Sequence, residues 1–129
     1  MRHGSHKLYL LIIIFYFFYS IISYADVIGG YSVNLKILDK ITAKINSIEI
    51  DVGKTYEFGT LRIEIFSCYK RPPEEIPEDF VLLRIYDILN GSNSEKIYQG
   101  WMISSSPSAT PFEHPIYDLW IQNCKINKE

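Results

Sequence analysis

The most constraining feature of this chain is a hydrophobic run at residues 8–25 that ends abruptly in polar sequence. A basic N-terminal stretch precedes the run, and Ser23-Tyr24-Ala25 closes it directly before Asp26. A charged start, an apolar centre and small residues three and one before a junction are typical of a secretory signal peptide. We therefore expect export and cleavage after Ala25, so that a single domain at residues 26–129 carries the fold.

An uncleaved membrane anchor is the alternative interpretation of the same run. Its eighteen residues are close to the roughly 20 that cross a hydrocarbon core, and its tyrosines do not forbid insertion. In both cases most of the chain leaves the cytoplasm. We expect it in the periplasm of a Gram-negative cell or, if uncleaved, anchored to the inner membrane by residues 8–25. Membrane contact is expected only in the uncleaved form.

The exported part is mildly acidic and has the size of one domain. Without Arg2 and Lys7, 11 basic side chains stand against 15 acidic ones, a formal charge of −4. A nucleic-acid partner would require a basic patch, so we expect no nucleic acid as a partner. An acidic domain also gains no attraction to an anionic membrane surface, which binds basic segments.

The two cysteines, Cys68 and Cys124, both lie in the exported part. In a reducing cytosol they would be two buried thiols, but an even count in an exported chain predicts a disulfide. The bridge would close a loop of about 57 residues and stabilise the fold by roughly 4 kcal/mol. It would tie the end of the third strand to the end of the last.

Alternating apolar and polar residues predict strands along most of the domain. In residues 43–52 the apolar positions change phase, so a β-bulge near Asn46 and Ser47 is expected. Residues 80–89 are apolar on both sides, as in a central strand covered on each face. The remaining expected strands lie at 33–37, 61–65, 96–103 and 116–124.

Turn-forming residues separate these strands, at Gly53, Gly59 and the stretch 90–94. Short strands, hairpin-length links and the absence of a helical period predict an all-β fold. We expect a small antiparallel β-sandwich or barrel of about six to seven strands.

The longer connection at 69–79 is rich in proline and carboxylates. Four acids at Glu74, Glu75, Glu78 and Asp79 could suggest a Ca²⁺ site, but the alternating ligands and the glycine of such loops are missing. A solvated acidic loop, with ion pairs to Lys70 and Arg71, is the preferred interpretation, and no metal or cofactor is expected.

The second connection, at 104–115, and the start of the strand after it contain serines, His114 and Asp118. A catalytic triad is recognised by geometry, and no Gly-x-Ser-x-Gly elbow is present. His114 is the only histidine after cleavage, which excludes a site with several histidine ligands. We expect no catalytic residues; an envelope-acting hydrolase using Glu113, His114 and Asp118 remains the alternative.

Two tryptophans, Trp101 and Trp120, could form a platform with Tyr117 for a sugar ring or a proline-rich peptide. Core packing is the preferred interpretation, because aromatic side chains dominate small β cores. By a period of two, Asp118, Trp120 and Cys124 are expected to share one face of the last strand.

Several longer motifs carry a resemblance. They are Leu38-Asp39-Lys40, Phe58-Gly59-Thr60-Leu61, Cys68-Tyr69-Lys70-Arg71-Pro72-Pro73-Glu74-Glu75, Pro77-Glu78-Asp79, Gly100-Trp101-Met102, Ser105-Ser106-Pro107 and Glu113-His114-Pro115-Ile116-Tyr117-Asp118. With them the chain resembles the domain-of-unknown-function family 2155, small exported proteins of alphaproteobacteria. The resemblance implies export and similar size, and brings no activity or site residues.

Taken together, these features favour a non-enzymatic binding or structural module of the periplasm or cell envelope. Its partner would be an unidentified envelope protein or cell-wall component, contacted through the two long loops. The candidate interaction surface consists of Arg71, Glu74, Glu75, Trp101, Glu113, His114 and Asp118.

Overall fold

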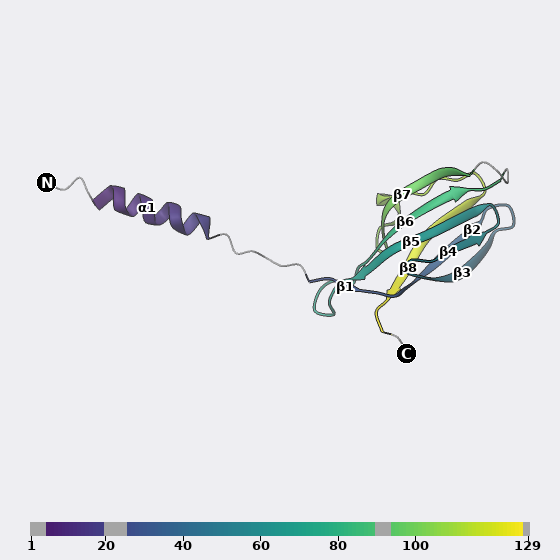
Figure 1. Cartoon of the computed structure of the whole chain (residues 1–129), viewed down its shortest axis with the longest axis horizontal. Helices are drawn as coiled ribbons and strands as arrows, with labels where there is room; N and C mark the ends of the chain where they lie inside the picture. The colour runs from purple at the N-terminus through teal and green to yellow at the C-terminus, as the bar shows by residue number, and fades with distance from the viewer. Residues whose placement is uncertain (1–4, 20–25, 90–93, 128–129) are drawn as a thin grey trace.

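Two antiparallel β-sheets face each other in a sandwich (Figure 1), in a computed structural model that describes residues 5–19, 26–89 and 94–127. One sheet has the order β1-β5-β6-β7, with β4 also paired to β5; the other has the order β3-β2-β8. The strands are β1 (Ile28–Gly29), β2 (Ser32–Asp39), β3 (Lys44–Asp51), β4 (Thr55–Phe58), β5 (Leu61–Lys70), β6 (Asp79–Asp87), β7 (Glu95–Ile103) and β8 (Tyr117–Lys125). The expected all-β class and antiparallel pairing are confirmed, as a sandwich and not a closed barrel.

Ahead of the sandwich, the helix α1 (Ser5–Phe18) contains the first part of the hydrophobic run. Its side chains from Leu8 to Tyr16 are 45–79% exposed, so the helix is apolar on all sides. No helix in the described ranges is both long and apolar enough to cross a membrane. The expected cleavage junction at 23–25 lies outside the described residues.

Alternation along the strands builds the core between the two sheets. Val33, Leu35 and Ile37 of β2 are fully buried, and Val81, Leu83 and Ile85 of β6 face them from the other sheet. β6 is central in its sheet, as expected, but only one of its faces is covered. Its outward residues from Phe80 to Tyr86 are half-buried.

The expected bulge near Asn46 and Ser47 is wrong. β3 pairs with β2 in unbroken register from Lys44 to Asp51. The phase change has another cause: Ala43 lies in the preceding turn with φ 56°, and Ile45 faces solvent with 58% of its surface exposed.

Bulges occur instead at Phe66 of β5 and Gln122 of β8, where the ladder register shifts by one residue. Before Phe66 the odd-numbered residues of β5 face the core, and after it Cys68 does; β8 changes in the same way between Ile121 and Cys124. Trp120 therefore faces away from the core, and the expectation that it shares a face with Cys124 is wrong.

Because both bulges rotate a cysteine inward, the predicted Cys68–Cys124 disulfide forms, with a Cα–Cα distance of 5.9 Å. It joins β5 of one sheet to β8 of the other, and both cysteines are buried. Gly30 packs directly on the bridge, where a Cβ would overlap both sulfur atoms.

The two ends of the sandwich are well separated. β5 and β6 pair from Lys70↔Asp79 at one end to Leu61↔Asp87 at the other, a span of about 26 Å at the usual rise per residue. The first end also holds β1, whose residues pair with Tyr69 and Lys70, and we call it the β1 end. The second end holds His114 beside Asp87, and we call it the His114 end.

Candidate functional site

The seven candidate surface residues fall into two groups, one at each end of the sandwich. Arg71, Glu74, Glu75 and Trp101 lie at the β1 end, and Glu113, His114 and Asp118 lie at the His114 end. The second loop itself connects the ends. It begins beside Asp79, whose backbone carbonyl accepts a hydrogen bond from the Ser104 amide. It ends at Ile116, whose backbone carbonyl accepts a hydrogen bond from the Lys40 amide.

At the His114 end, both ring nitrogens of His114 are engaged. Nδ1 accepts hydrogen bonds from the amides of Ile116 and Tyr117, each at 3.2 Å. This assigns the ring proton to Nε2, which donates to Asp87 Oδ2 at 3.1 Å. The ring is buried and stacks between Phe112 and Tyr117. A histidine held in this way positions a loop and has no free nitrogen to act as a base.

Asp87, and not Asp118, is the carboxylate partner of His114. Burial acts to raise the pKa of Asp87, but the hydrogen bonds from His114 and from the Leu89 amide outweigh it and hold that pKa below its ordinary value. Asp118 instead pairs with Lys40 at 2.8 Å, and Lys40 also donates to the His114 carbonyl. Lys40, His114 and Asp118, with the exposed Glu113, line an open hollow of about 290 Å³, and Asp87 is not part of its lining.

The hollow therefore gives the hydrolase alternative no support from geometry. Both ring nitrogens of His114 are already hydrogen-bonded, so it has none free to act as a base. Asp118 is paired with Lys40, and Glu113 faces solvent. Within the described ranges, no group of three metal-ligating side chains lies close enough to hold a metal ion.

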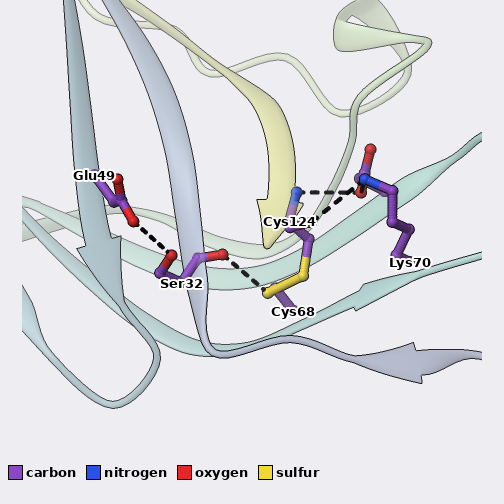
Figure 2. Close-up of a disulfide and its surroundings, with 6 residues drawn as sticks. Ser32, Glu49, Cys68, Lys70 and Cys124 are labelled. Atoms are coloured by element: carbon purple, nitrogen blue, oxygen red, sulfur yellow. Dashed lines mark hydrogen bonds and ion pairs between the residues drawn. A yellow bond between two sulfur atoms is a disulfide. The ribbon is translucent and has the colours of Figure 1, made fainter. Parts of the chain in front are cut away.

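At the β1 end, a polar cluster surrounds the disulfide (Figure 2). Ser32 donates to Glu49 and, through its carbonyl, contacts Cys68 Sγ. The buried Asp79 accepts from the Cys124 amide at 3.1 Å and pairs with Lys70 Nζ at 3.2 Å. Asp79, expected in a solvated acidic loop, is thus a structural residue of this end.

The connection at residues 71–78, which we call the proline loop, is braced at its neck and within its turn. The Arg71 amide binds the Glu78 carbonyl at 3.0 Å, and the Glu75 amide binds the Pro72 carbonyl at 3.1 Å. The Arg71 guanidinium reaches Glu75 and lies over the Phe80 ring. The loop presents Ile76, which is 79% exposed.

Glu78 connects the proline loop to the start of the second loop. Its carboxylate accepts from Ser104 Oγ, from the Ser105 amide and from Ser105 Oγ. Burial acts to raise the pKa of Glu78, but the hydrogen bonds from Ser105 and Ser104 hold it below its ordinary value. The two loops therefore meet at the β1 end through Glu78, while the far part of the second loop runs to the His114 end.

Beside the proline loop, four partly exposed side chains, three of them aromatic, form a surface that we call the aromatic patch. Val27, Tyr69, Phe80 and Trp101 line an open, apolar hollow of about 280 Å³. The rings of Tyr69 and Trp101 lie 6.0 Å apart, and Trp101 is 43% exposed. The expected burial of both tryptophans in the core is wrong. Tyr117 is buried at the His114 end, so no platform joins it to Trp101.

Sequence reasoning missed Tyr69, Phe80 and Val27 as surface residues. The sequence does show that Tyr69 and Phe80 flank the proline loop at equal distances. In the structure the two residues are paired across β5 and β6, which places them beside each other on the outer face. Val27 carries no signal, because only the pairing of β1 with β5 brings it there.

Comparison with known proteins places the chain among bacterial proteins of unknown activity. Residues 33–124 match the family described as "Uncharacterized protein conserved in bacteria (DUF2155)", which confirms the resemblance inferred from the motifs. The chain is also 33% identical, over 87 residues, to the uncharacterized protein RP359 of Rickettsia prowazekii (strain Madrid E). The matched segment is 67% of this chain and 56% of that relative, so it spans just over half of the relative's length. No solved structure matches the chain.

Proposed function

Since the chain belongs to the DUF2155 family, whose description assigns no activity, we propose a function from its own surface: it is an exported, non-enzymatic binding module of the cell envelope. Export is supported by the hydrophobic run at 8–25 and by a disulfide between two buried cysteines. Structural disulfides persist in oxidising compartments outside the cytoplasm.

Binding is proposed to occur at the β1 end, through a surface made of the proline loop and the aromatic patch. The observation that carries this proposal is the apolar hollow around Trp101 next to a braced, protruding loop. Aromatic residues and arginine are enriched at the centres of protein interfaces. A loop that is already held in one conformation loses little entropy on binding.

The proposal narrows the surface expected from the sequence. Arg71, Glu74, Glu75 and Trp101 remain in it, joined by Ile76 and the other patch residues. Glu113, His114 and Asp118 lie at the far end, where His114 and Asp118 are assigned to holding the second loop in place and Glu113 is exposed. The proposed partner is an envelope protein or a cell-wall component, with the membrane surface as a partner only while the hydrophobic run is attached.

Site-specific photocrosslinking in the native host tests the proposal. Trp101, Ile76 and Glu113 are each replaced, in separate full-length chains, by benzoylphenylalanine. We expect covalent adducts with an envelope component from positions 101 and 76, and none from position 113, since Glu113 is also exposed but lies at the far end.

Adducts from position 113 alone, or from no position, would contradict binding at the β1 end. A hydrolytic activity on envelope material that His114→Ala abolishes, while the variant keeps its fold by circular dichroism, would favour the hydrolase alternative instead.

A further inference from the structure

The aromatic patch lies at the point where the hydrophobic run enters the folded domain. We propose that, while the run at 8–25 is attached, this patch rests in the lipid headgroup layer of the membrane that holds the run. The inference rests on the export and the β1-end surface proposed above, and it names the partner of that surface as the lipid interface.

Chain length fixes the depth of the patch. The hydrophobic run ends at Ala25, and Val27, two residues later, is itself part of the patch. Two residues span at most about 7 Å. The headgroup region of one leaflet is roughly 5–7 Å thick. If Ala25 lies at the hydrocarbon boundary, Val27 therefore lies within the headgroup layer or at its outer edge, and β1 is held beside it.

The fold then brings the rest of the patch to the same depth. Ile28 and Gly29 pair directly with Lys70 and Tyr69, and Tyr69 pairs with Phe80 on the next strand. Trp101 lies on β7, with its ring 6.0 Å from that of Tyr69. No residue of the patch is more than three strands from β1, at about 4.8 Å per strand, so the patch extends along the membrane when β1 lies on it.

The side chains of the patch suit this layer. Tryptophan and tyrosine are enriched at membrane–water interfaces, because one part of each ring system is apolar and another carries a hydrogen-bonding group. Arg71 borders the patch, and its aliphatic stem can lie on apolar surface while its charge reaches water or phosphate. Arg71 already lies over the Phe80 ring.

Apolar contact, and not charge, is the expected driving force. The exported part carries a formal charge of −4, and the exposed Glu74 and Glu75 lie in the neighbouring loop. Anionic lipid therefore offers no general attraction. The attached hydrophobic run takes the place of electrostatic attraction, because it keeps the patch at a high local concentration near the bilayer. Zwitterionic lipid should be sufficient.

The two tryptophans of the chain provide a matched test. Trp101 lies in the patch, whereas Trp120 is half-buried on the outer face of the other sheet, opposite Lys36. The full-length variants Trp120→Phe and Trp101→Phe each retain one indole. They are reconstituted in phosphatidylcholine vesicles whose acyl chains carry bromine close to the headgroup, and in unbrominated vesicles as the reference.

We expect brominated lipid to reduce Trp101 emission at least about twofold more than Trp120 emission, because only Trp101 lies at the interface. Trp101 should also be protected from aqueous iodide in vesicles, compared with detergent. Addition of phosphatidylglycerol should leave both results unchanged.

Equal quenching of the two tryptophans, or full access of iodide to Trp101 in vesicles, would overturn the inference, as would quenching that requires anionic lipid. If position 101 crosslinks to an envelope protein while the lipid-quenching result is negative, the binding proposal stands and the lipid partner is wrong. If neither experiment gives a signal at position 101, both proposals fail.

Discussion

At the His114 end, the side chain of Tyr117 packs so closely against Gly59 that no side chain fits at that position. The Tyr117 ring packs edge-on against Phe58 and stacks on His114, and its hydroxyl lies against Gly59. A Cβ at Gly59 would overlap that hydroxyl, and the residue has a φ of 58°, in the left-handed region where side chains are disfavoured. Gly59 therefore meets two constraints at once, one of backbone conformation and one of space.

Gly59→Ala should reduce the free energy of unfolding by about 3 kcal/mol, from a left-handed backbone penalty of roughly 1–2 kcal/mol and the displacement of Tyr117. Gly53→Ala is the matched control. Gly53 also has a positive φ, of 81°, but has open space where the Cβ would be. It should cost only the backbone part, about 1 kcal/mol. Urea denaturation of the oxidised protein measures both, and equal losses would show that the Tyr117 contact contributes nothing.

The sequence could not identify the partner of His114. It offered Asp118, four residues away, but strand pairing brings Asp87 to the ring from 27 residues earlier in the chain. The register of β5 with β6 sets where Asp87 lies, and no local pattern encodes that register. Candidate sites built from neighbours in sequence fail for this reason in β folds, where contacts are mostly distant along the chain.

Among the elements, the bulges of β5 and β8 were within reach of sequence reasoning. In both strands the last buried isoleucine precedes the cysteine by three residues, as Ile65–Cys68 and Ile121–Cys124, which breaks a period of two. If both cysteines must face the core to pair, each strand needs one extra residue. The phase change in 43–52 attracted the bulge prediction instead, although an exposed Ile45 explains it at no cost in pairing.

The hydrogen bonds from Ser104 and Ser105 to the Glu78 carboxylate, which we call the Glu78 clamp, join the two loops and should be sensitive to acid. Because the pKa of Glu78 is lowered in the folded protein, its ionised form contributes stability that is fully present above the ordinary glutamate pKa. That stability is lost as the pH falls through the lowered folded value. The clamp is therefore closed at neutral pH and loosens in acid, when the protonated carboxyl accepts less strongly from Ser104 and Ser105.

Glu78→Gln should speed amide hydrogen exchange in residues 71–78 and 104–106 at pH 7 by about fivefold to tenfold, equivalent to roughly 1–1.4 kcal/mol of local stability. Glu74→Gln, an exposed change in the same loop, should leave exchange unchanged. After correction for intrinsic rates, the wild-type protein should approach the Glu78→Gln protein as the pH falls below the glutamate range. Identical protection at pH 7 would contradict a clamping role.

For the whole molecule, the sequence predicted a single β-rich domain, its disulfide and its two long loops, because alternation, cysteine count and proline content are local properties. It did not predict which loop ends meet. That depends on strand order, which places β1 and β4 on the same side of β5 and pairs β8 with β2. The exposed position of Trp101 follows from the same order, since β7 is paired only with β6 within the described strands.

Export makes a prediction about the whole chain that one measurement decides. Asp26 and Val27 are exposed and precede the first strand, which begins at Ile28, so cleavage after Ala25 would leave every strand intact. The intact mass of the protein from its native host should correspond to a chain that begins at Asp26. This mass should be lower by two hydrogen atoms than that of the reduced chain, because Cys68 and Cys124 are oxidised.

A chain that begins at Met1 in the membrane fraction would establish the anchored form, in which the aromatic patch stays at the bilayer. Two free thiols in either form would contradict export itself, since a buried bridge of this kind forms and persists in an oxidising compartment.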